Sequence, residues 1–356
     1  MRKFFLNAII ASLVGVSMFG SCVKQAEDNS EELQLESLRA WISANRPDME
    51  EYEEGLFMKV HKVTSSSSTL TFADDDWVEV TYSAQTLDGN YYYNMYSAMA
   101  DTLGTFTYYT HFVPDRVSYY YSAYYLSQAQ IYALQNMGLM DSVEIIALSK
   151  YVYSGTAAEG TSIPTGYEGN SYLSSYAPAH IKMRFNSRIS DMVEYERMEV
   201  LLYATEELGL AVDDSIADYS MLYMKKLVEC PDADTISTDT TVNVWYTGKF
   251  TDGFVFDTNV AAVAKDHNIY VEPTDDSDSY VPLSFTYGSS DDDTYITGFR
   301  EMIYNMRLGE KAIGIMSSNL AYGEDGSTSG NTLIRPNEPL VFIIEVTDET
   351  EDDEDE

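Results

Sequence analysis

Two stretches of the chain share an alternation of apolar and polar residues that predicts strands. Residues 77–94 read WVEVTYSAQTLDGNYYYN and residues 241–259 read TVNVWYTGKFTDGFVFDTN. Each is an alternating strand followed by an Asp-Gly turn and a second, aromatic strand. Residues 132–155 and 301–323 match in the same way, ending in Tyr-Ser-Gly and Tyr-Gly. Because both matches occur in the same order at similar spacing, the sequence predicts two copies of one module.

Helical spacing of apolar residues occurs outside these strands. It covers residues 31–47, which end at Pro47, and the first part of the segment 191–229 that separates the copies. We expect the apolar positions of the connecting helix to form a packing face; they are Val193, Met198, Leu201, Leu202 and Leu208. The segments GLFMKVHKV and SMLYMKKLV are predicted to be the first strand of each module.

The second copy has one predicted helix, around Thr297 to Met306, and strands elsewhere. One helix packed on a curved antiparallel sheet is an α+β solution, so we predict an α+β fold with two such modules joined by a helical linker. The expected domains are a signal peptide at 1–22, a helical segment at 23–50, the first module at 51–190, a linker helix at 191–218, the second module at 219–347 and an acidic tail at 348–356.

The N-terminus predicts export. Arg2 and Lys3 precede an apolar stretch that is too short to be a stable membrane span and is typical of a signal peptide. Small residues before Cys22 resemble the lipobox of bacterial lipoproteins, which implies a lipid anchor at Cys22; an ordinary cysteine is the alternative. The composition also resembles lipoproteins of Bacteroidota. We therefore expect a lipid-anchored protein of the cell envelope, in the outer membrane, facing either the periplasm or the surface.

Charge and the rarer residues exclude several classes of function. The net charge of −37 excludes nucleic acid as a partner, because phosphate binding needs a basic surface. After lipidation of Cys22 only Cys230 remains, so no internal disulfide is expected. The four histidines, His61, His111, His180 and His267, lack ligand spacing. No metal site and no cofactor are therefore predicted.

Five pieces of the second copy resemble the FKBP-type peptidyl-prolyl isomerases, and they stand in family order. They are VNVWYTGKFTDGFVFDTN, VPLSFTYG, YITGFREMIYNMRLGEK, SSNLAYGEDG and IRPNEPLVFIIEV. The resemblance covers about 130 residues of the second module. It implies an apolar pocket between sheet and helix that binds proline-containing polypeptides, and it leaves open whether a macrolide binds there too.

Roles follow from the resemblance residue by residue. Apolar walls and floor are implied for Tyr246, Phe256, Phe285, Ile296, Phe299 and Phe342. Tyr322 matches a hydroxyl donor and Asp257 a carboxylate near the bound carbonyl. Leu283 and Tyr295 depart from the family pattern, and an insertion of 24 residues, 258–281, replaces the arginine expected to pair with Asp257. Lys265 is one candidate substitute. Each aromatic residue taken singly also fits an ordinary core position.

These residue types suit prolyl isomerisation because that reaction needs no proton transfer. An X-Pro amide faces a rotation barrier of about 18–20 kcal/mol, while its two forms differ by only about 0.5–1 kcal/mol. A site need only bind the twisted amide better than either planar form. The alternative is a binding or scaffolding lipoprotein without turnover, whose tyrosines serve as contact residues.

The first copy has lost parts of the pattern. Tyr92 and Tyr93 stand where the second copy has Phe256 and Asp257, and Gln130 stands where it has Phe299. With a polar floor and no carboxylate, the first module is expected to be a degenerate copy that serves packing or protein contacts.

Overall fold

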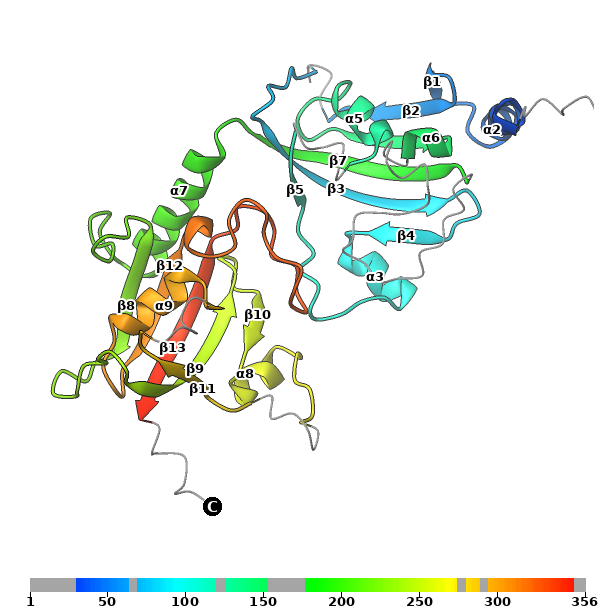
Figure 1. Ribbon diagram of the computed structural model, residues 1–356. Coiled ribbons are helices and arrows are strands. Elements are labelled where there is room, and N and C mark those ends of the chain that lie inside the picture. Colours follow the sequence, from blue (N-terminus) through cyan, green and yellow to red (C-terminus); the bar gives the residue numbers. More distant parts are fainter. Residues whose placement is uncertain are drawn as a thin grey trace, which may run out of the picture.

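The computed structural model describes residues 30–63, 69–119, 126–152, 177–273, 280–288 and 294–348, which form two lobes around two antiparallel sheets (Figure 1). The predicted signal peptide, Cys22 and the acidic tail from residue 349 onward lie outside the described residues. Within the described ranges, no helix is long and apolar enough to cross a membrane.

The two sheets repeat one strand order. The first contains β1 (Glu50–Glu53), β2 (Leu56–His61), β3 (Trp77–Thr86), β4 (Tyr91–Asn94), β5 (Asp115–Ser118), β6 (Ser142–Ala147) and β7 (Ala179–Ile189). The second contains β8 (Leu222–Val228), β9 (Thr241–Lys249), β10 (Val255–Thr258), β11 (Leu283–Thr286), β12 (Lys311–Met316) and β13 (Leu340–Asp348). The order β2-β6-β7-β3-β4, with β5 on β3, matches β8-β12-β13-β9-β10, with β11 on β9. All pairs are antiparallel, in agreement with the predicted α+β class.

Matching helices pack on the two sheets. In the first module they are α3 (Ser97–Leu103), α5 (Gln128–Leu134) and α6 (Ser149–Val152); in the second they are α8 (Ala261–Asp266) and α9 (Thr297–Tyr304). Helix α9 confirms the helix predicted from residue 297, and it buries Phe299, Met302 and Ile303 against the sheet at helical spacing. Helix α8 was not predicted. It lies in the insertion, at the position that α3 occupies after β4.

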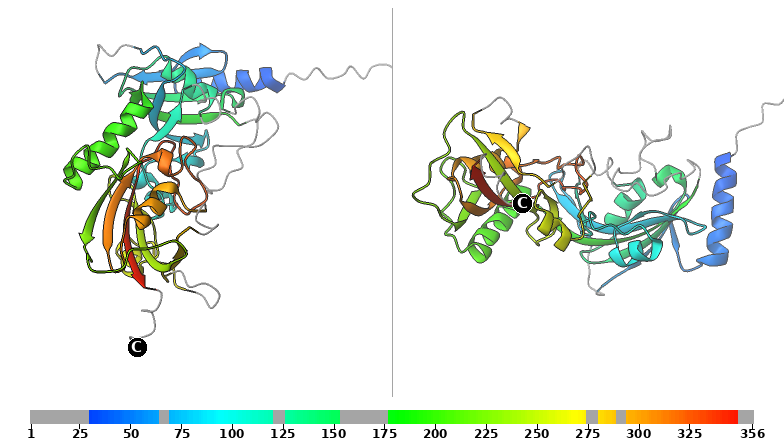
Figure 2. Two further views of the ribbon diagram at one scale, coloured as in Figure 1. Left: turned by 60° about the vertical axis from the view of Figure 1, so that its left-hand side comes forward. Right: turned by 90° about the horizontal axis from the view of Figure 1, so that it is seen from below.

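The predicted N-terminal helix is α2 (Ser30–Asn45), which packs at the end of the first module furthest from the second (Figures 1 and 2). Its apolar side, with Leu35, Leu38 and Ile42, contacts Phe57 and Leu148. The first strands predicted for each module, β2 and β8, are also present.

The linker helix α7 (Met192–Leu202) continues in a π-helical turn, Tyr203–Glu207, and the linker is not helical beyond that point. Its predicted packing face is mostly wrong, since Val193 is 76% and Leu202 61% exposed. The buried side instead carries Met192, Val200 and Glu196, and Glu196 accepts hydrogen bonds from the Ser318 backbone N–H and hydroxyl. The rotation of the helix therefore packs Val200 against Ile315 and Val341 of the second sheet and satisfies the Ser318 loop through a buried carboxylate.

Charged side chains join the two modules. The loop before β13 reaches across to the start of β5 (Figures 1 and 2), where Arg116 donates to the Asn337 carbonyl at 3.0 Å. The Arg116 side chain is 1% exposed and lies 3.2 Å from Glu79 and 3.5 Å from Glu338. From the other side, Arg335 donates to the Pro114 carbonyl at 2.9 Å. Because buried charges are tolerated only when paired, these contacts fix how the two modules meet.

Candidate active site

Four aromatic rings from four elements meet on the concave side of the second sheet. Tyr246 comes from β9, Phe256 from β10, Phe299 from α9 and Phe342 from β13. Phe299 lies edge-on to Tyr246 and Phe342, with ring centroids 5.7 Å and 5.2 Å apart, and Phe256 lies edge-on to Phe342 at 5.8 Å. Edge-to-face packing of this kind is favourable and holds the rings in place. The structure thus brings together four of the site residues that the sequence predicts.

Gly248 on β9 makes room for this cluster. A Cβ atom at this position would lie 2.5 Å from Cζ of Phe256 and 3.0 Å from Cε1 of Phe342. The strand backbone therefore forms part of the wall, and any side chain here would push the Phe256 ring aside.

Hydroxyl and carboxylate groups lie at the edge of the aromatic cluster. The Tyr246 hydroxyl donates to Oδ2 of Asp257 at 2.8 Å, and the Asp257 residue is exposed. Burial and then the charge on Asp257 raise the pKa of Tyr246, and the same two causes raise the pKa of Tyr322. Both hydroxyls therefore keep their protons at neutral pH. Tyr322 is 39% exposed, so its hydroxyl is accessible as a hydrogen-bond donor.

Asn259 is a site residue that the sequence prediction missed. Its Oδ1 accepts from the Tyr246 backbone N–H at 2.7 Å, and its amide donates to the carbonyls of Val244 and Val281 at 2.9 and 3.1 Å. One buried side chain therefore fixes both ends of the insertion to β9. Only its place directly after the Phe-Asp-Thr strand could have indicated this role.

Two of the predicted site residues lie deeper than the rest. Phe285 on β11 is 0% exposed and contacts the rings of Tyr295 and Tyr304 in the core. Ile296 precedes α9 and packs, partly buried, against the same core. Phe285 thus supports the pocket from behind, through Tyr295, which in turn lies 6.1 Å from Phe299.

The described part of the insertion packs beside the cluster. Val263 and Ala264 of α8 and Ile269 form a small apolar core with Val255. The Lys265 ammonium lies over the Tyr270 ring at 4.4 Å, and the partner of Asp257 is the Tyr246 hydroxyl. Asp257 and Tyr322 both keep exposed surface beside the described insertion residues.

The corresponding region of the first module is polar, as the sequence predicts. The prediction that it has no carboxylate is wrong, because Asp115 lies there. Asp115 faces Val80 in the sheet register, as Leu283 faces Val244 in the second module. Tyr93 stacks on Tyr82 at 4.3 Å and donates to Oδ2 of Asp115 at 2.5 Å. The carboxylate comes from a different strand than Asp257 does, and the matched motifs could not reveal this.

Gln130 occupies the position in α5 that Phe299 has in α9, the third residue after the N-cap. Its side-chain oxygen accepts from the Ser127 backbone N–H at 2.9 Å, which completes a capping box. At the position where the second module has an apolar floor residue, the first module therefore has Gln130, which caps the N-terminus of α5.

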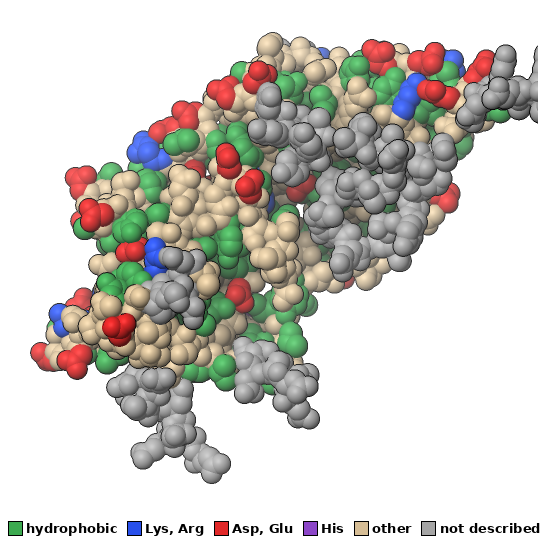
Figure 3. All heavy atoms as spheres, viewed as in Figure 1, with side chains coloured by type: hydrophobic (Ala, Val, Ile, Leu, Met, Phe, Trp, Pro, Cys, Tyr) green, Lys and Arg blue, Asp and Glu red, His purple; other side chains and the backbone are tan. Residues whose placement is uncertain are grey.

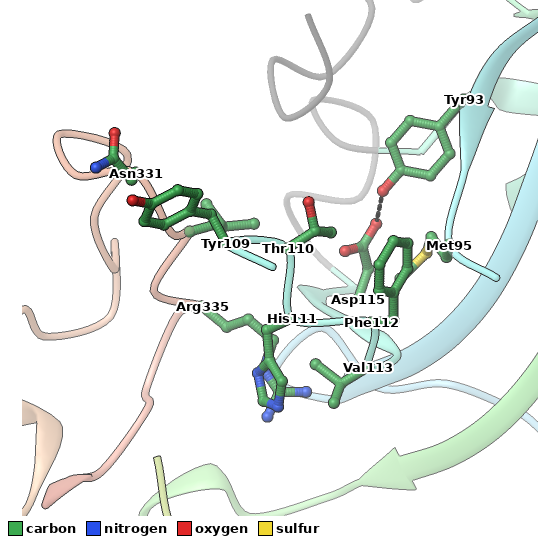
Figure 4. A pocket seen from close by; sticks show the side chains of 11 residues that line it. Tyr93, Met95, Tyr109, Thr110, His111, Phe112, Val113, Asp115, Asn331 and Arg335 are labelled. Atoms are coloured by element: carbon green, nitrogen blue, oxygen red, sulfur yellow. Dashed lines mark hydrogen bonds between the residues drawn. The ribbon is translucent and has the colours of Figure 1, made fainter. Parts of the chain in front are cut away.

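A pocket of about 80 Å³ lies between the modules (Figure 4). Tyr93, Phe112 and Asp115 line it from the first module, and Leu333 and Arg335 from the second. Burial raises the pKa of the Asp115 carboxyl to about 6. The loop before β13 of the second module therefore forms a wall over the polar cleft of the first.

The surface in Figure 3 carries many acidic and few basic side chains. Among the described residues, no group of three metal-binding side chains comes together. His180 instead contacts Glu144 at 2.6 Å, and His111 contacts Asp252 at 2.7 Å. The chemistry available at the aromatic cluster is therefore apolar binding with hydroxyl donors and one carboxylate.

Comparison with known proteins agrees with this geometry. Residues 233–347 match the family model described as FKBP-type peptidyl-prolyl cis-trans isomerase. A probable FKBP-type peptidyl-prolyl cis-trans isomerase of Haemophilus influenzae is 30% identical over 125 residues, covering 35% of this chain and 42% of that protein. FK506-binding protein 1B of Aspergillus fumigatus is 46% identical over 65 residues, covering 18% of this chain and 49% of that protein. The chain thus spans less than half the length of either relative.

Solved structures are similar at a lower level. The three FKBP domains of wheat FKBP73 give a TM-score of 0.29 at 18% identity, covering 84% of this chain and 98% of that one. A peptidyl-prolyl cis-trans isomerase of Pseudomonas syringae gives 0.31 at 24% identity, covering 44% and 91%. These TM-scores are too low to assign a role to any residue. The family model and the two relatives show that residues 233–347 are an FKBP-type peptidyl-prolyl cis-trans isomerase domain.

Proposed function

We propose that the second module catalyses cis–trans isomerisation of X-Pro bonds in exported polypeptides. The observation that supports it most directly is the aromatic cluster of Tyr246, Phe256, Phe299 and Phe342, with Asp257 and Tyr322 accessible at its edge. The cluster offers a dry surface for a proline ring. The two edge residues offer polar contacts for the peptide backbone beside it.

The geometry suits a reaction that only twists a bond. Rotation about the C–N bond breaks the amide resonance, so the twisted form carries less charge separation than either planar form. An apolar site from which water is excluded therefore favours the twisted form. A millionfold acceleration requires about 8 kcal/mol of such differential binding. The protonated Tyr322 hydroxyl can hold the peptide carbonyl while the proline ring stays fixed against the aromatic walls.

The proposed setting is the bacterial cell envelope. A signal peptide at residues 1–22 and a lipid anchor at Cys22 would place both modules outside the cytoplasm, in the outer membrane, on either face. The substrates would then be polypeptides that fold after export. A macrolide is proposed as a competing ligand, since it would need the same apolar cluster.

Exchange NMR on a short X-Pro peptide tests the proposal. The soluble chain lacking residues 1–22 should broaden the cis and trans proline signals, and Phe256→Ala should abolish the broadening. The matched control is Tyr92→Phe, at the equivalent position of the first module, which should leave it unchanged. If several X-Pro peptides show no broadening while circular dichroism shows a folded chain, the enzyme proposal is wrong.

The alternative, a binding lipoprotein without turnover, rests on the first module. Its cleft has Tyr93, Asp115 and Gln130 where the second has groups of different polarity, and a loop of the second module covers it. However, Tyr92 and Tyr93 from the tyrosine-rich run are buried, so they cannot serve as contact residues for a partner. Peptide binding without line broadening would favour this alternative.

A further inference from the structure

The loop at residues 105–114 of the first module, here called the bridging loop, contacts three segments of the second module. His111 stacks on Phe250 at a ring-centroid distance of 4.7 Å and lies tilted against Phe254 at 4.5 Å. Its Nε2 lies 2.7 Å from Oδ2 of Asp252. Phe250, Asp252 and Phe254 belong to the turn between β9 and β10. Pro114, at the other end of the loop, accepts a hydrogen bond from Arg335.

Tyr109 lies at the centre of these contacts and joins the two sides of the aromatic site. Its hydroxyl donates to the Ile269 carbonyl, in the insertion, at 2.7 Å. Its own carbonyl accepts from the Thr332 hydroxyl at 2.8 Å. Thr332 belongs to the loop at residues 324–339, which begins two residues after Tyr322 and ends at β13. One residue of the first module thus bonds to both segments that flank the site.

The Tyr109 ring also packs close to the site itself. It lies against the small apolar core of Val255, Ala264 and Ile269, and Val255 directly precedes Phe256 and Asp257 in β10. Burial, the neighbouring Tyr280 and the charge on Asp257 raise the pKa of Tyr109. The hydroxyl is therefore within electrostatic range of the Asp257 carboxylate and is protonated at neutral pH.

We infer that Tyr109 is a positioning residue for the isomerase site of the second module, and this inference rests on the function proposed above. Among the ring contacts of the described residues, none joins Tyr109 to the four clustered rings. It holds the insertion and the loop at 324–339 at a fixed separation on either side of them. In this inference an extended polypeptide on the aromatic cluster passes between these two segments, so their separation sets how well residues flanking the proline bind.

The neighbouring Tyr108 provides a matched control. It is 52% exposed, and its ring packs only on Phe106 within the same loop among the ring contacts described. Tyr108→Ala and Tyr109→Ala remove the same side chain from adjacent positions, and of the contacts described only those of Tyr109 reach the other module. Tyr109→Phe keeps the ring and loses only the hydroxyl bond to Ile269. The Thr332 hydroxyl bonds to the backbone carbonyl of residue 109, so Thr332→Val is the variant that removes this second bond.

The first measurement is independent of activity. In the full chain lacking residues 1–22, hydrogen exchange is compared at the amides of Ser327, Ile334 and Ile269, which bond within the two flanking segments. Tyr109→Ala should speed exchange about tenfold at Ile269, and Thr332→Val should do so at Ser327 and Ile334, whereas Tyr108→Ala should leave all three amides unchanged. Equal effects of Tyr108→Ala and Tyr109→Ala at Ile269, or no effect of Tyr109→Ala there, would overturn the inference.

The second measurement uses isomerase kinetics on a long and a short X-Pro peptide. Tyr109→Ala should raise KM about fivefold for a peptide with several residues on each side of proline, with kcat within about twofold, and Tyr109→Phe should fall between. The short peptide should be affected less. A loss confined to kcat would contradict a positioning role. If the wild-type chain shows no isomerase activity, the proposed function fails, while the exchange comparison still decides whether Tyr109 holds the two segments.

Discussion

The Asp115 carboxyl should make the first module less stable as the pH rises. Its pKa is raised from the usual 3.8 to about 6 by burial in the pocket between the modules. Between these two values the folded chain holds a proton that the unfolded chain has released. Stability therefore falls with increasing pH in this window, the opposite of an ordinary paired carboxylate.

The magnitude follows from the size of the shift. About two pKa units at about 1.4 kcal/mol each give about 3 kcal/mol, of which about 2–3 kcal/mol is lost between pH 4 and pH 7.5. Asp115→Asn has no proton to lose and can still accept from the Tyr93 hydroxyl. The variant should therefore gain about 2–3 kcal/mol relative to the wild type over the same range.

Urea unfolding at both pH values measures the difference. In a Trp245→Phe background the tryptophan fluorescence comes from Trp77 in the first module and from Trp41 in α2, which packs on that module. Asp252→Asn, followed in the full chain by circular dichroism, is a control of opposite sign, because the hydrogen bond from His111 holds the pKa of Asp252 below its usual value. Its stabilising effect is present at neutral pH and lost on acidification. If the difference in unfolding free energy between the wild type and Asp115→Asn is the same at both pH values, the reasoning is wrong.

Three further predictions concern packing and charge. Gly248→Ala should lower kcat/KM about tenfold or more with the fold retained, because the added Cβ would displace Phe256; wild-type kinetics with normal circular dichroism would contradict this. Glu196→Ala should cost about 2–3 kcal/mol in urea unfolding, since it leaves the Ser318 N–H and hydroxyl without their acceptor, and Glu196→Gln should cost less; equal losses would be inconsistent with that role. Arg116→Ala should cost about 3–5 kcal/mol because the buried Glu338 and the partly buried Glu79 lose a partner. Arg197→Ala, at an exposed pair with Glu194, should cost under about 1 kcal/mol, and similar losses for the two variants would argue against the buried network.

Local patterns in the sequence were sufficient for the strands and for the aromatic cluster. The alternation around Tyr246 predicts β9, and the motif order places Phe256, Phe299 and Phe342 near it, because a strand's alternation and a helix's spacing are properties of neighbouring residues. The rotation of α7 was not predictable in this way. Its apolar stripe suggested burial of Val193 and Leu202, yet the groups that its buried side contacts are distant in the sequence: Ile315 packs on Val200, and Ser318 is 122 residues away from Glu196.

The same limit applies to the site's surroundings. Asp115 could not be aligned with Leu283 from the motifs, because only the sheet register brings β5 into the place of β11. Tyr109 gives no local signal, since its two partners belong to the other module. Long-range pairs of this kind depend on how the sheets are oriented, which no short pattern encodes.

The buried charges between the modules also have a consequence for the order of folding while the chain is being synthesised. Arg116 has Glu79 as a partner on the adjacent strand, and Arg335 has Glu338 three residues along, at 2.8 Å. Each half can therefore neutralise its own charge before the other half has been synthesised. When the modules dock, two ion pairs that have already formed come together. Docking therefore buries no unpaired charge from either module. A chain that is threaded from its N-terminus can thus complete the first module early and receive the second later.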